Sequence, residues 1–209
     1  MKLLFLYTIF NLSFSTQAEA QQRDFGPTGI EGLSVEQLVK LYNGSILFLT
    51  TDPAKSGGTS SLTEAAVMFT VPPETAWKLI SKTVDQPKYI DGCIEVKVIH
   101  TSPGTSYEVR KVGNFMVTYT YGVIQNFLPE KKCLYWSLDT TYAENDLNSL
   151  HGYWQLYPYA NGRTLGRYGN QISFKNLPAF IEKGRLKSGV KDALTAVKKY
   201  VDSGGTYRK

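Results

Sequence analysis

The chain has 209 residues, of which 42% are hydrophobic and 13% aromatic, and its formal net charge is +5 at pH 7. This length predicts one domain with a core large enough to enclose a cavity. The excess positive charge lies in residues 182–209, and no nucleic-acid-binding motif is present, which argues against nucleic acid as a partner.

Residues 1–20 have the features of a secretory signal peptide. Lys2 precedes an apolar stretch at residues 3–14, and Ala18-Glu19-Ala20 matches an A-x-A cleavage site. The apolar stretch is too short to span a bilayer comfortably, although an uncleaved N-terminal anchor is the alternative interpretation. We therefore expect cleavage near Ala20 and a soluble protein that is periplasmic or secreted.

Residues 21–61 form an N-terminal extension in this interpretation. Ser34 and Gln37 make a capping box, which predicts a short helix over residues 35–42. Asn43-Gly44 then turns the chain into an apolar, strand-like stretch at residues 45–51, and residues 52–61 form a loop rich in Gly and Ser. The extension could add a helix and an edge strand to the main domain, or cover the outer face of its sheet.

The main domain has a specific order of elements. A β-prone stretch at residues 62–71 ends at Pro72-Pro73, and a helix follows at residues 74–83. Turn residues then separate six predicted strands at residues 93–100, 106–112, 115–127, 133–141, 148–157 and 163–174. A last amphipathic helix follows Pro178, with a stripe that contains Leu186, Val190 and Leu194. This order predicts an α+β fold whose curved sheet grips the last helix and leaves room for an apolar ligand.

Aromatic residues concentrate on the predicted strands. Most are expected to pack in the core, but a tyrosine at a cavity can line the wall with its ring and fix a polar group with its hydroxyl. The predicted ligand-binding residues are Tyr107, Phe115, Val117, Tyr119, Tyr121, Trp154, Tyr168, Leu186, Val190 and Leu194. Phe115, Val117, Tyr119 and Tyr121 are expected to share one face of their strand.

No catalytic residue, metal site or cofactor is predicted. The only histidines, His100 and His151, have no metal-ligand spacing. His151 is interpreted as a structural histidine, with an acid–base role in a cyclase-like pocket as the alternative. Arg163 or Arg167 could place a guanidinium in the cavity, although exposure is the default for both.

Cys93 opens the first and Cys133 the fourth of the strands predicted in residues 93–174. Three strand spacings separate these two strands, so they should lie about 14 Å apart. A disulfide requires Cα atoms within about 7 Å, so two buried free thiols are expected.

Five motifs stand in order along the main domain: Pro72-Pro73-Glu74-x-x-Trp77, Asp85-x-x-x-Tyr89, Gly152-x-Trp154-x-Leu156-x-Pro158, Thr164 with Tyr168, and Leu177-Pro178. Together they resemble the START-like (SRPBCC) superfamily, in its polyketide cyclase, lipid-transport and coenzyme-Q-binding START branch. The resemblance covers residues 62–204 and leaves residues 205–209 as a tail. It implies the helix-grip fold, with a seven-stranded antiparallel sheet around the C-terminal helix, and binding of an apolar small molecule.

The leading hypothesis is an exported carrier that binds or shuttles a lipid, quinone or isoprenoid between the sheet and the last helix. Lys183, Arg185, Lys187 and Lys191 could contact an anionic membrane, or simply form a solvated helix face. A cyclase or dehydrase on the same fold is the first alternative. An interaction module without a ligand, using residues 45–51 as a partner surface, is the second.

Overall fold

The computed structural model describes residues 23–49, 62–175 and 179–209, and for residues 179–188 it describes the backbone alone. In these residues the strands form one antiparallel sheet in the order β1-β2-β8-β7-β6-β5-β4-β3. The strands are β1 Ile46–Leu49, β2 Thr63–Phe69, β3 Cys93–Ser102, β4 Thr105–Gly113, β5 Thr118–Leu128, β6 Cys133–Leu138, β7 Leu147–Tyr159 and β8 Arg163–Phe174. The α-helices are α1 Val35–Tyr42, α2 Pro73–Ile80 and α3 Ala179–Asp202, and short 3-10 helices occupy η2 Thr83–Lys88, η3 Pro129–Lys131 and η4 Ala160–Gly162.

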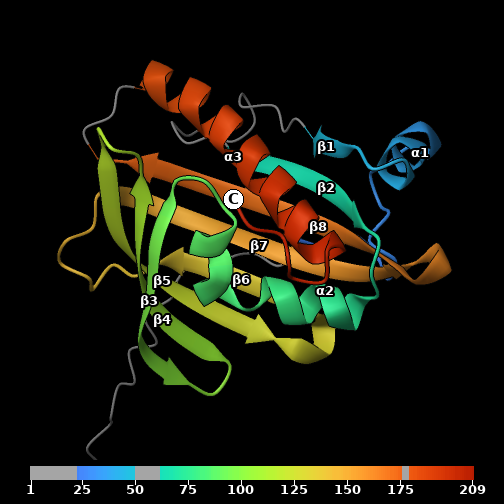
Figure 1. Ribbon diagram of the computed structural model, residues 1–209, viewed down its shortest axis with the longest axis horizontal. Coiled ribbons are helices and arrows are strands. Elements are labelled where there is room, and N and C mark those ends of the chain that lie inside the picture. The colour runs from blue at the N-terminus through green and yellow to red at the C-terminus, as the bar shows by residue number, and fades with distance from the viewer. Residues whose placement is uncertain (1–22, 50–61, 176–178) are drawn as a thin grey trace, which may run out of the picture.

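The predicted α+β helix-grip fold is confirmed. The long helix α3 crosses one face of the curved sheet, and α2 lies on the same side (Figure 1). Seven strands, β2 to β8, make up the main sheet, and the extension adds β1 at its edge, where Ile46 lies opposite Val67. No helix in the described part of the chain is long and apolar enough to cross a membrane.

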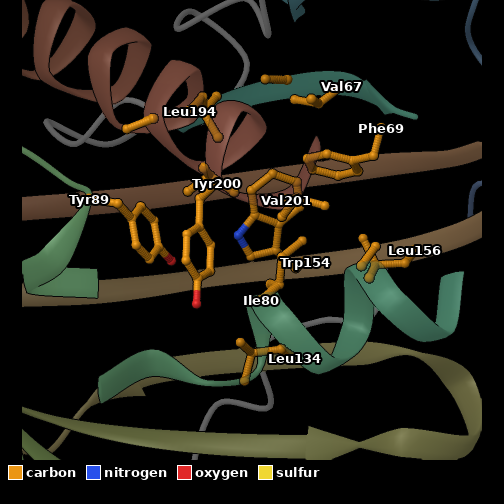
Figure 2. Close-up of a cluster of buried hydrophobic side chains, with 14 residues drawn as sticks. Val67, Phe69, Ile80, Tyr89, Leu134, Trp154, Leu156, Leu194, Tyr200 and Val201 are labelled. Carbon is orange, nitrogen blue, oxygen red and sulfur yellow. The ribbon is translucent and has the colours of Figure 1, made fainter. Parts of the chain in front are cut away.

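The apolar stripe of α3 packs on the inner face of the sheet. Leu194 and Val201 are buried in a core cluster with Val67, Phe69 and Trp154 (Figure 2). Val197 belongs to the same cluster. The Tyr200 ring stacks on the Tyr89 ring with centroids 4.0 Å apart. This packing explains why residues at helical spacing on α3 are apolar, since one stripe of the helix is enclosed by strands.

The N-terminal extension covers the outer face of the same sheet. Side chains alternate along a strand, so Ala66 and Met68 of β2 point away from α3 and pack against Leu41 of α1. Phe25 is buried among Cys133, Tyr135 and Tyr153. The extension therefore adds an edge strand and also covers the outer face, which were the two roles considered for it.

Arg167 of β8 holds the extension in place. Its guanidinium lies 3.9 Å from the centre of the Phe25 ring. Its Nη1 also donates hydrogen bonds to the carbonyl oxygens of Gly29 at 3.0 Å and Glu31 at 3.2 Å. A cation over an aromatic ring with two carbonyl acceptors is a satisfied environment for a largely buried arginine.

Cys93 and Cys133 are both free thiols in buried positions, as the predicted strand order required. Burial raises the pKa of each thiol above its ordinary value. Both side chains are therefore protonated near neutral pH, and they pack as small apolar groups.

The last residues of the chain pack back onto η2 and β3. The Lys209 side chain donates hydrogen bonds to the carbonyl oxygens of Ile90 at 3.0 Å and Cys93 at 3.3 Å. Tyr207 packs against the core cluster beneath α3. The predicted tail is thus in contact with the domain.

Replacing Phe25 by Ala removes the ring that fills the space between Tyr153 and Arg167. We predict a loss of about 3 kcal/mol in the free energy of unfolding, measured by urea denaturation, because truncation of a buried phenylalanine typically costs this much. The matched control is Val35→Ala on the exposed side of α1, which should change the value by less than about 0.5 kcal/mol. Equal effects of the two substitutions would contradict a docked extension.

Candidate functional site

A cavity of about 400 Å³ lies between α3 and the inner face of the sheet. Val190, Ala193, Leu194 and Val197 of α3 form its roof. Its floor is made by strands β5 to β8, with the side chains of Tyr119, Tyr121, Gln125, Leu134, Trp136, Leu150, Trp154, Tyr168, Asn170 and Ile172. The element order predicted a hollow in this place.

Aromatic rings make up the centre of the floor. The Trp154 and Tyr168 rings lie 4.9 Å apart between centroids, and the Trp136 and Tyr168 rings lie 5.9 Å apart. Trp136 packs directly over Gly152, where a Cβ atom would come within 2.2 Å of the indole. Glycine is therefore required at position 152 for Trp136 to lie against the strand.

A polar cluster stands at one side of the cavity. The Arg110 guanidinium lines the cavity and pairs with the buried Glu108 carboxylate, with Nη2 and Oε2 2.8 Å apart. Nη1 of Arg110 also donates to Oε1 of Gln86 at 3.1 Å, and the Thr83 hydroxyl donates to Glu108. Nε of Arg110 also donates to Glu108, so three of the five N–H donors of Arg110 are engaged. Among the residues that the structure describes, two donors are left for another acceptor.

Burial and charge act in opposite directions on Arg110. Burial, the largest single effect, disfavours its charge, but Glu108, Tyr121 and Cys93 together outweigh it, and the pKa of Arg110 is raised above its ordinary value. Arg110 therefore stays charged. Burial also raises the pKa of Tyr121 and of Tyr168, so both hydroxyls are neutral hydrogen-bonding groups near pH 7.

The structure brings together most of the residues predicted to bind a ligand. Tyr119, Tyr121, Trp154 and Tyr168 line the floor, and Val190 and Leu194 line the roof. The side chain of Leu186 lies outside the described residues. Whether these side chains contact a ligand remains a prediction.

Phe115, Val117 and Tyr107 do not line the cavity. Strand β5 begins at Thr118, so Phe115 and Val117 belong to the preceding turn, and Phe115 is 94% exposed. Tyr107 points outward and its ring lies beside His100, because the inward residues of β4 are Glu108 and Arg110. An error of one residue in the assumed phase of a strand moves every side chain to the opposite face.

The histidine and arginines considered for the cavity also lie elsewhere. His151 alternates with the inward residues Leu150 and Gly152 and shares the outer face with Tyr153. Arg167 contacts Phe25, and Arg163 lies over the Tyr42 ring. Among the side chains that the structure describes, no group of three or more potential ligands could hold a metal ion.

Arg110 is the functional candidate that the sequence interpretation missed. Its signal is the Glu108-x-Arg110 spacing, which places opposite charges on the same face of one strand. Because β4 lies between β3 and β5, a charged pair on its inner face must be buried and matched. This spacing on an internal strand indicates a polar end in the cavity.

Comparisons with known proteins give a consistent result. A sequence model of the family described as polyketide cyclase / dehydrase and lipid transport matches residues 69–197. No curated protein matches the chain significantly. Three similar solved structures illustrate the range of proteins that share this fold.

A STAR-related lipid transfer protein from Xanthomonas axonopodis is 9% identical, with a TM-score of 0.61 over 75% of this chain and 92% of its own. The Zhui aromatase/cyclase from Streptomyces sp. R1128 is 11% identical, with a TM-score of 0.59 over 70% and 93% of the two chains. A START superfamily protein from Mycobacterium smegmatis is 12% identical, with a TM-score of 0.59 over 68% and 97%.

At these identities the solved structures share the fold, and they include a lipid transfer protein and a cyclase. The family model covers more than half of the chain, from the end of β2 to the buried part of α3. The chain belongs to the polyketide cyclase / dehydrase and lipid transport family, whose START-like fold binds apolar small molecules.

Proposed function

We propose that this protein binds and shuttles an amphipathic small molecule, such as a lipid, quinone or isoprenoid, in the cavity beneath α3. The apolar body of the ligand lies between the aromatic floor and the aliphatic roof. An acceptor oxygen of the ligand lies at Arg110. The observation that carries this proposal is a cavity of about 400 Å³ with an apolar wall and the Arg110–Glu108 salt bridge at its side.

The size of the apolar wall supports a long hydrocarbon body. Each buried methylene group contributes roughly 0.8 kcal/mol, whereas association costs at least about 4 kcal/mol in lost freedom of motion. A small polar metabolite has too few apolar groups to offset this cost in a cavity lined by Trp136, Trp154 and Leu194.

The acid–base properties of the cavity favour binding over a cyclase or dehydrase reaction. General acids and bases work best when their pKa lies near the working pH. Burial moves the pKa of Cys93, Tyr121 and Tyr168 upward, away from neutrality. His151, the residue considered for acid–base chemistry, lies on the outer face of the sheet.

Ala193 offers a direct test, because it lies in the roof and carries a small side chain. We predict that Ala193→Phe weakens binding of a dansyl-labelled fatty acid at least tenfold, because the new ring occupies the space of the ligand. Asp192→Phe adds the same ring one residue away at an exposed position and should leave the affinity unchanged. Fluorescence titration measures both, and unchanged affinity in Ala193→Phe would exclude this cavity as the binding site.

Shuttling requires contact with a membrane, and we propose that the β4–β5 hairpin makes it. Phe115 and Met116 at its tip are 94% and 70% exposed. The hairpin adjoins the cavity, because Gly113 at the base of the hairpin lines the cavity wall. Gly189 of α3 lines the same cavity. Lys191 is exposed on α3, two residues after the cavity residue Gly189, and the side chains of Lys183, Arg185 and Lys187 lie outside the described residues. Exposed apolar groups beside basic ones are suited to an anionic bilayer.

We predict that the double substitution Phe115→Ser and Met116→Ser lowers binding to phosphatidylglycerol vesicles at least tenfold in co-sedimentation, because two apolar side chains no longer enter the bilayer. Its affinity for the dansyl-labelled fatty acid should stay unchanged. The control is Val35→Ser with Val39→Ser, an exposed apolar pair on α1, which should leave vesicle binding intact. Loss of vesicle binding in the α1 variant alone would contradict the prediction, because the membrane contact would then lie on α1.

We also propose that the protein acts after export, on the basis of the signal-like sequence of residues 1–20. The mature chain would then begin at Gln21. N-terminal sequencing of the protein isolated from its own host should find Gln21 as the first residue. An intact Met1 in the cytoplasmic fraction would contradict export.

A further inference from the structure

The cavity contains a second polar group at a distance from Arg110. Gln125 of β5 lines the floor and is only 1% exposed. Its side-chain oxygen Oε1 has no hydrogen-bond partner among the residues that the structure describes. A buried carbonyl without a partner is costly, and such groups are rare in folded proteins. An unpaired acceptor in the wall of a ligand cavity therefore points to a donor on the ligand.

The neighbours of Gln125 use their donors elsewhere. Trp136 lies directly opposite on β6, but its indole Nε1 donates to Oδ1 of Asn170 at 3.1 Å. Ser106 lies opposite on β4, and its hydroxyl is directed to Oε1 of Glu108 at 3.5 Å. The protein thus keeps the Gln125 oxygen available on the cavity floor.

The strand register places Arg110 and Gln125 at different points along the cavity. Arg110 lies opposite Tyr121, and Gln125 follows four residues later on the same face of β5. At about 3.3 Å per residue, the Cα atoms of the two residues are roughly 13 Å apart along the strands. The Arg110 side chain extends from its Cα atom toward Glu108, two residues nearer to Ser106, which lies opposite Gln125. The rings of Trp136 and Tyr168 form part of the apolar wall of the same cavity.

The two groups also differ in hydrogen-bonding character. Arg110 can only donate, whereas the Gln125 oxygen can only accept. We propose that the ligand carries an acceptor oxygen at Arg110 and, at another point of its apolar body, a hydroxyl group that donates to Gln125. This inference rests on the proposed function and narrows its ligand class from amphiphiles in general to hydroxylated ones.

Two probes that differ in one hydroxyl test the inference. They are the methyl ester of lauric acid and the methyl ester of ω-hydroxylauric acid. The change in tryptophan fluorescence reports their binding, because Trp136 and Trp154 line the cavity. Both are titrated into the full chain and into Gln125→Leu, which replaces the amide by an apolar side chain of similar size without an acceptor.

We expect the wild-type protein to bind the hydroxylated ester about tenfold more tightly than the plain ester. In Gln125→Leu this preference should vanish, while the plain ester binds at least as tightly as before. Gln125→Met is a second variant without an acceptor and should behave in the same way. Urea denaturation should find neither variant less stable, since each removes a buried unpaired group.

The possible failures are distinguishable. Binding of both esters with equal affinity to the wild-type protein overturns the hydroxyl inference and leaves the proposed function standing. A preference for the hydroxylated ester that persists in both variants also overturns it, because another group must then recognise the hydroxyl. Failure of both esters to bind the wild-type protein at any concentration counts against the proposed function itself, and with it against the inference.

Discussion

The attachment of the last part of α3 to the sheet is the constraint on which the site depends. Tyr200 stacks on Tyr89 at 4.0 Å, and the Asp202 carboxylate accepts a hydrogen bond from the Thr70 backbone at 2.7 Å. Lys198 donates to the carbonyl oxygen of Met68. These contacts hold the helix against β2 and η2 at one end, while Val190 and Ala193 nearer its start face a hollow. Because these contacts fix the last part of the helix, its first part is held above the aromatic floor, and the cavity between them stays open.

The same strands serve two surfaces, because neighbouring residues point to opposite faces. Tyr153 donates to Glu64 at 2.7 Å beneath the extension, whereas Trp154 lines the cavity. Arg167 binds the extension, whereas the next residue, Tyr168, belongs to the cavity floor. The extension therefore buries Tyr153 and Arg167, the outward-facing neighbours of the cavity residues Trp154 and Tyr168. Docking of the extension and the shape of the floor are thus mechanically related through β7 and β8.

Much of the fold could be predicted from the sequence, since turns and apolar periodicity mark the strands and the α3 stripe. The site was harder to predict. In β4 the usual alternation is reversed, because the polar residues Glu108 and Arg110 face inward while Tyr107 faces outward. The alternation of Phe115 and Val117 with Tyr119 predicts a strand that includes Phe115. The turn at Asn114 instead extends to Val117, because the Asn114 side chain accepts hydrogen bonds from the backbone N–H groups of Met116 and Val117. Arg110 was missed because an isolated arginine is usually exposed.

The most direct test of the account is to locate a bound amphiphile relative to the three tryptophans. Trp136 and Trp154 line the cavity, whereas Trp77 lies on α2 outside it. A doxyl-labelled fatty acid broadens NMR signals of nearby protons. The account predicts that the indole N–H signals of Trp136 and Trp154 broaden strongly and saturably while the Trp77 signal persists. Broadening of Trp77 alone, or equal broadening of all three, would contradict a ligand held between α3 and the sheet.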